Sequence, residues 1–141
     1  MSVEENKDIV RREAEEIFSQ GNLDAVDKIY APDYVGHEPT TPEGIRGLEG
    51  AKQFAAAYRN AFPDLQLTVE DQIAEGDKVA TRFTARGTHQ GELEGITPTG
   101  NQVEMKGIVI SRISEGKIAE DWTNFDALGM MHQIGAIRPP E

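Results

Sequence analysis

The spacing of hydrophobic residues predicts two helices at the start of the chain. Apolar side chains recur there at intervals of three and four, the period of an α-helix, and share one face: Val10, Ala14, Ile17 and Phe18. A capping-box pattern from Ser2 to Glu5 predicts where the first helix begins, and Gly21 predicts its end. Asn22 can cap a second, short helix, which Pro32 ends because proline disrupts a helix interior.

A third helix is predicted over about residues 48–62, where apolar side chains keep the helical period and Pro63 follows. The segment before it, Tyr34 to Gly47, has a different composition. Residues that favour turns interrupt it at Gly36, Pro39, Pro42 and Gly44. We therefore expect an irregular connection between the second and third helices.

Beyond Pro63 the hydrophobic period changes from nearly four to two, which is typical of β-strands. Four antiparallel strands are predicted, at about residues 65–73, 79–86, 102–113 and 117–125. A long, glycine-rich connection joins the second strand to the third. A short helix at about 128–134 closes the pattern.

Three helices followed by antiparallel strands predict an α+β fold in which the helices cover one face of the sheet. A chain of 141 residues has the usual size of one domain and can bury a substantial core. The sequence shows no internal repeat, linker or low-complexity segment. We therefore expect residues 1–141 to form a single domain.

The charge of the chain argues against two classes of partner. With 25 acidic and 14 basic residues, the formal net charge is −11, which would repel a phosphate backbone or an anionic membrane surface. Neither nucleic acid nor a membrane is expected as a partner. The sequence has no signal-peptide pattern and no apolar stretch approaching the ~20 residues of a membrane span, so we expect a soluble, cytoplasmic protein.

Several kinds of catalytic and metal site are absent from the sequence. There is no cysteine, no glycine-rich phosphate loop, no HExxH, no GxSxG and no EF-hand spacing. The three histidines, His37, His89 and His132, are scattered without the spacing of metal ligands, and only a mononuclear site completed by Glu38 or Glu92 stays open as an alternative. The sequence therefore predicts neither a metal nor a cofactor.

Adjacent carboxylates on the last predicted strand, Glu120 and Asp121, are candidates for acid/base chemistry. Side chains alternate along a strand, so only one of the two can enter a pocket on a given face. The alternation does not decide which one. Either carboxylate can instead form a surface ion pair across the sheet, with Arg82, Arg86 or Arg112.

Other side chains could serve a pocket. His37 lies in the irregular segment, where a scaffold can aim a loop residue into a cavity, and His89 lies where the second strand leaves the sheet. Either histidine can instead be exposed to solvent, His37 on a loop and His89 at the end of a strand. Most of the large apolar residues must be core, but some of them can line a cavity, among them Phe54, Tyr58, Phe62, Met105 and Trp122.

Five short phrases of the sequence point to a known family. They are Ala61 to Asp64, Ala74 to Ala80, Gly87 to Gly91, Gly95 to Gly100 and Gly116 to Trp122. Their order and spacing, over about residues 5–137, resemble those of the SnoaL-like polyketide cyclases, a branch of the nuclear-transport-factor-two-like superfamily.

This resemblance implies a cone-shaped α+β barrel, in which a curved antiparallel sheet and three N-terminal helices enclose one apolar pocket. Members often form homodimers. In characterised cyclases, an aspartate just before the tryptophan of the last strand acts as acid and base, and here that position is Asp121. The family's loop histidine matches His37.

The implied function is cofactor-free ring closure. Asp121 would remove a proton from a polyketide ester, and the enolate would attack a carbonyl of the same molecule in an aldol-type step. We expect a small hydrophobic or polyketide-like substrate, bound by Tyr34, Phe54, Tyr58, Phe62, His89, Met105 and Trp122. The alternatives are another pocket enzyme of this fold, such as an isomerase or epoxide hydrolase, or a non-enzymatic module that binds small molecules.

Overall fold

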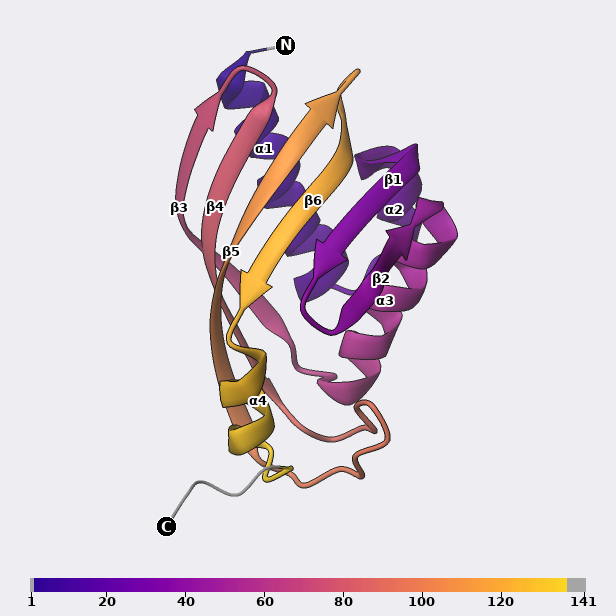
Figure 1. Cartoon of the computed structure of the whole chain (residues 1–141), viewed down its shortest axis with the longest axis vertical. Coiled ribbons are helices and arrows are strands. Elements are labelled where there is room, and N and C mark those ends of the chain that lie inside the picture. The colour runs from indigo at the N-terminus through magenta and orange to yellow at the C-terminus, as the bar shows by residue number, and fades with distance from the viewer. Residues whose placement is uncertain (1, 137–141) are drawn as a thin grey trace.

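The chain folds as a layer of helices packed on one face of a curved sheet (Figure 1). The computed structural model describes residues 2–136. Its helices are α1 (Val3–Arg12), α2 (Val26–Ile29), α3 (Gly47–Ala61) and α4 (Ala127–Gln133). Its strands are β1 (Tyr30–Glu38), β2 (Thr41–Arg46), β3 (Gln66–Glu75), β4 (Lys78–Thr88), β5 (Gln102–Ser114) and β6 (Lys117–Phe125). The α+β class is confirmed, whereas the single domain over residues 1–141 stays a prediction.

The N-terminal helix begins as its capping box predicts. The Ser2 hydroxyl accepts a hydrogen bond from the Glu5 backbone N–H at 3.1 Å, and the Glu5 carboxylate accepts one from the Ser2 N–H at 3.3 Å. After Arg12 the helix widens into a π-helical segment, Glu13–Ser19, which the hydrophobic spacing did not reveal. Such wide turns are often found at functional sites.

The sheet has six strands in the order β2-β1-β6-β5-β4-β3, and it is mixed because β1 runs parallel to β6. The prediction of four antiparallel strands was therefore incomplete. Residues expected to form an irregular connection supply most of β1 and all of β2. Pro42 is tolerated because β2 is an edge strand.

Gly36 explains why β1 was missed. A Cβ atom at this position would lie 2.5 Å from the Tyr34 hydroxyl, so the bend of the tyrosine side chain over the backbone requires glycine. In the sequence, this glycine indicated a loop. In the structure, it lets Tyr34 reach across to β6, where Gly36 is the register partner of Asp121.

Two clusters of buried apolar residues form the core. One lies beneath α1, α2 and α3 and includes Ile17, Ile29 and Ile118. The other lies around the C-terminal end of α3 and α4 and includes Phe62 and Met130. Phe18 and Phe54 pack against both clusters, and the cavity described below lies beside these two rings.

The opposite face of the sheet carries exposed apolar residues. Ile73, Ile108, Ile110 and Trp122 are 70%, 52%, 41% and 37% exposed.

Within residues 2–136, no helix combines the length and the apolar character that a membrane crossing requires. The cytoplasmic location stays a prediction.

Candidate active site

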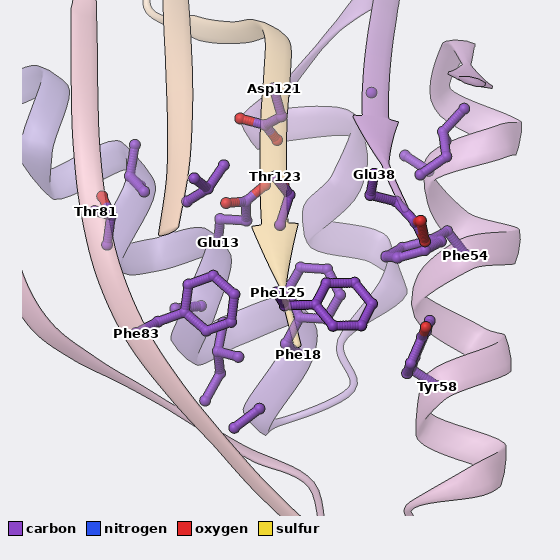
Figure 2. A pocket seen from close by; sticks show the side chains of 18 of the residues that line it. Glu13, Phe18, Glu38, Phe54, Tyr58, Thr81, Phe83, Asp121, Thr123 and Phe125 are labelled. Atoms are coloured by element: carbon purple, nitrogen blue, oxygen red, sulfur yellow. The ribbon is translucent and has the colours of Figure 1, made fainter. Parts of the chain in front are cut away.

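A cavity of about 110 Å³ lies between the helices and the concave face of the sheet. Most of its wall is apolar, and Phe18, Phe54, Phe83, Met105 and Phe125 are prominent in it. Figure 2 shows the phenylalanine rings Phe18, Phe83 and Phe125 at one end, and the carboxyl groups of Glu13 and Asp121 toward the other. Three acids therefore line this mostly apolar cavity: Glu13, Asp121 and, on the side of α3, Glu38.

Asp121 enters this cavity from the middle of β6 and is only 5% exposed. Its Oδ2 accepts a hydrogen bond from the Tyr34 hydroxyl at 3.0 Å. Ser111 is its register partner on β5, but the Ser111 hydroxyl and Asp121 Oδ1 do not meet the geometry of a hydrogen bond. Burial raises the pKa of Asp121, because it disfavours the charged form, and nearby hydroxyl and carboxyl donors offset part of that rise.

Glu13 is the functional candidate that sequence reasoning missed. It begins the π-helical segment, is 6% exposed, and accepts a hydrogen bond from the buried Tyr30 hydroxyl. Burial and then the charge of Asp121 raise its pKa well above the ordinary range. The available signal was its position, since Glu13 lies between Val10 and Ile17 on the apolar face of the helix, where a carboxylate is unexpected.

Two tyrosines of β1, Tyr30 and Tyr34, donate hydrogen bonds to these carboxyl groups. The rings of Tyr30 and Tyr34 contact each other edge to face, with centroids 4.5 Å apart. Burial, reinforced by the neighbouring carboxylates, raises the pKa of both phenols. At neutral pH both are therefore hydrogen-bond donors, one to each acid.

The neighbouring carboxylate, Glu120, points to the other face of the sheet. It pairs with the His37 imidazole at 2.7 Å and with the Arg112 guanidinium at 3.4 Å. A hydrogen bond from His37 is the main cause that lowers the pKa of Glu120. The structure thus decides the choice that alternation left open: Asp121 faces the cavity, and Glu120 forms the surface ion pair.

His37 lies at the rim. It is among the residues that line the cavity, but its side chain is 46% exposed, bonds to Glu120 and stacks on Trp122 with ring centroids 5.8 Å apart. The loop expected to carry His37 is strand β1. The imidazole is therefore directed away from Asp121.

The residues predicted to bind substrate divide into two groups. Tyr34, Phe54, Tyr58 and Met105 line the cavity, whereas Phe62, His89 and Trp122 do not. Phe62 belongs to the core cluster around the C-terminal end of α3, and its ring packs against the buried His89 ring with centroids 5.8 Å apart. The His89 imidazole also forms a hydrogen bond with the Thr99 hydroxyl. Trp122 lies on the outer face because it follows Asp121 in the strand alternation.

A family model described as SnoaL-like polyketide cyclase matches residues 8–134 of this chain. The chain belongs to the SnoaL-like polyketide cyclase family. The resemblance seen in the sequence is confirmed.

Known proteins of this family are similar over most of the chain. Nogalonic acid methyl ester cyclase of Streptomyces nogalater is 31% identical over 84% of this chain and 89% of its own length. Aklanonic acid methyl ester cyclase DnrD of Streptomyces peucetius is also 31% identical, over 91% of this chain and 89% of its own. A solved structure, a candidate SnoaL-like polyketide cyclase from Jannaschia sp. CCS1, superposes with a TM-score of 0.87 at 25% identity, covering 97% and 94% of the two chains.

Metal ligands are not gathered in the part of the chain that the structure describes. Across residues 2–136, no three His, Asp or Glu side chains are grouped so that they could hold a metal ion. That the site needs neither a metal nor a cofactor stays a prediction from the sequence.

Proposed function

We propose that this family member is a cofactor-free cyclase that closes a ring in a polyketide ester, with Asp121 as the base. The observation that carries the proposal is the buried Asp121 carboxylate, held by Tyr34 in an apolar cavity. A carboxylate in water, with a pKa near 3.9, is a weak base. Burial raises the pKa of Asp121 and so makes it a better proton acceptor.

The reaction begins when Asp121 removes a proton from an activated methylene group. The resulting enolate carbon then attacks a carbonyl carbon of the same molecule. Holding the enolate carbon close to the carbonyl carbon contributes most to the lowering of the activation barrier, since well-oriented intramolecular reactions gain roughly 7–11 kcal/mol. General base catalysis contributes a further factor of about 10²–10⁴.

Tyr34 is the residue that we expect to position Asp121. Its hydroxyl donates to Oδ2 and so leaves Oδ1 free to take the proton. His37 was the second catalytic candidate from the sequence. Its pairing with Glu120 makes a role at the rim a better proposal than proton transfer at Asp121.

The substrate class follows from the relatives. Two of them are named as cyclases of nogalonic and aklanonic acid methyl esters, and we propose a polyketide ester of the same class for this protein. The cavity of about 110 Å³ is smaller than the ~300–1,000 Å³ of most ligand sites. We therefore expect aromatic side chains such as Phe54 and Tyr58 to move when a substrate enters.

A second candidate function is hydrolysis, in which Asp121 would activate a water molecule. The cluster of Glu13, Tyr30 and Tyr34 around Asp121 favours it, because such a polar group could also hold water. A non-enzymatic binding module is the third possibility.

Mass spectrometry of the two esters named above, after incubation with the protein, separates these functions. Ring closure by aldol addition leaves the mass of the ester unchanged but alters its chromatographic retention. Hydrolysis of the methyl ester consumes one water and releases methanol, so the mass of the product changes. An ester that is bound and recovered unaltered would favour the binding module and contradict the proposed function.

We also propose that the protein forms a homodimer through the outer face of the sheet. The exposed Ile108 and Ile110 on β5 and Trp122 on β6 form an apolar surface that a second copy could cover. Sedimentation at micromolar concentration should show two chains, and Ile110→Lys should shift them toward one. A monomer in both samples would contradict the proposal.

A further inference from the structure

Glu13 and Asp121 come from opposite ends of the chain and meet inside the cavity (Figure 2). They are 6% and 5% exposed, and both line the same mostly apolar cavity. Burial penalises each carboxylate charge, and two such charges that share one buried site also repel each other. One of the two acids is therefore expected to keep a proton.

The surrounding groups indicate which acid keeps this proton. Tyr30 donates to Glu13 Oε2 and Tyr34 donates to Asp121 Oδ2, so each carboxyl has one phenol. Asp121 is also the register partner of Ser111 on β5, whose buried hydroxyl has no hydrogen-bond partner of its own among the described residues. A hydroxyl can rotate to donate to a nearby charge, and donors favour the ionised form, so Asp121 is the better place for the charge.

No cation is available that would let both acids ionise. Among the described residues, neither lysine nor arginine lines the cavity, and the His37 imidazole is bound to Glu120 outside it. Burial and the charge of Asp121 both raise the pKa of Glu13, which agrees with a proton on the glutamate. With Oε2 occupied by Tyr30, Oε1 is the oxygen that can carry it.

We propose that Glu13 is the acid of this site: it holds the single proton that the carboxyl pair shares, and it delivers that proton to the oxygen formed by ring closure. The delivery step rests on the proposed cyclase function. Nothing in the sequence resemblance assigned a role to Glu13.

The chemistry balances without any further reactant. Asp121 takes the methylene proton, the C–H electron pair forms the new C–C bond, and the carbonyl π pair moves to oxygen. Glu13 then protonates that alkoxide and becomes a carboxylate. The proton now on Asp121 passes to Glu13 within the cavity that both acids line, so the site resets without exchanging a proton with solvent.

Infrared spectroscopy tests the location of the proton directly, because a protonated carboxyl has a C=O band that a carboxylate lacks. The probe is the wild-type protein at neutral pH, labelled with ¹³C in the side-chain carboxyl of glutamate or of aspartate. We expect one protonated band that shifts only with the glutamate label, disappears in Glu13→Gln and persists in Asp121→Asn. Absence of the band, or a shift with the aspartate label, would overturn the proposal. The labelled wild-type protein decides this even if a variant fails to fold.

Turnover of nogalonic acid methyl ester separates this inference from the proposed function. We expect Glu13→Gln to slow ring closure about 10²-fold or more, since it removes the general acid. If Asp121→Asn loses activity while Glu13→Gln keeps it, the inference fails and the proposed function stands. If Asp121→Asn keeps full activity, the proposed function fails, and the infrared result still decides where the proton lies.

Discussion

The two faces of β6 place adjacent carboxylates in opposite environments. Glu120 faces outward, where His37 and Arg112 lower its pKa and stabilise its charge. Asp121 faces inward, where burial raises its pKa and only hydroxyl and carboxyl donors reach it. The comparison shows that position in the alternation, rather than residue type, makes one carboxylate part of a surface ion pair and the other a candidate base.

The largest expected difference between the two faces is in catalysis. Asp121→Asn keeps the size of the side chain but removes the base, so turnover of a polyketide methyl ester should fall by about 10²–10⁴. Glu120→Gln is the matched control and should retain nearly all activity. Steady-state kinetics on both variants measure this, and equal losses would remove the distinction between the faces.

A smaller effect is expected when the inner face loses one donor. Tyr34→Phe removes the hydrogen bond to Asp121 Oδ2, a bond to a charged group worth about 1.5–3 kcal/mol. Turnover should fall roughly 10- to 100-fold. The pKa of Asp121, read from the pH–rate profile, should rise further because its ionised form loses the hydrogen bond from Tyr34. An unchanged profile would show that Tyr34 does not position Asp121.

Stability should depend on pH through the inner face. The raised pKa of Glu13 means that the folded state keeps a proton which the unfolded chain releases near pH ~4.3. The stabilisation is therefore complete below that pH and is lost as pH rises toward the pKa of the folded state. Glu13→Gln has no such loss, so its free energy of unfolding relative to wild type should increase with pH above ~4.3. Urea denaturation from pH 4 to 8 measures this difference, and a flat or falling curve would contradict it.

The smallest effect should come from the outer face. Glu120→Gln removes exposed pairs with His37 and Arg112, so the free energy of unfolding should fall by about 0–1 kcal/mol. The loss should shrink at high salt, because salt screens exposed charges. Thermal denaturation at two salt concentrations checks this, and a large, salt-independent loss would mean that the pair is less exposed than its geometry indicates.

The sequence predicts most of this fold, and its failures have physical causes. The range predicted for the last strand, 117–125, agrees with β6, since strict alternation and the Gly116 turn mark it clearly. β1 and β2 were missed because Gly36 and Pro42 usually indicate loops. Here one makes room for the Tyr34 hydroxyl and the other lies in an edge strand.

The site is less predictable than the fold. Asp121 was found through the family resemblance, because alternation alone gave two candidates. Glu13 was hidden among neighbouring acidic residues, Glu15 and Glu16, and only its spacing from Val10 and Ile17 distinguishes it. His89 was misplaced because sequence does not show toward which side a strand end turns. Trp122 was misplaced although alternation, with Asp121 directed inward, already puts its neighbour on the outer face.

The melting temperature of Asp121→Asn at neutral pH tests the central claim most directly, because it needs no substrate. If Asp121 is a buried functional carboxylate, removing its charge relieves a desolvation penalty, and the melting temperature should stay unchanged or rise. A clear decrease that weakens with added salt would instead show that Asp121 stabilises the fold as an ion pair, and would contradict its role as the base.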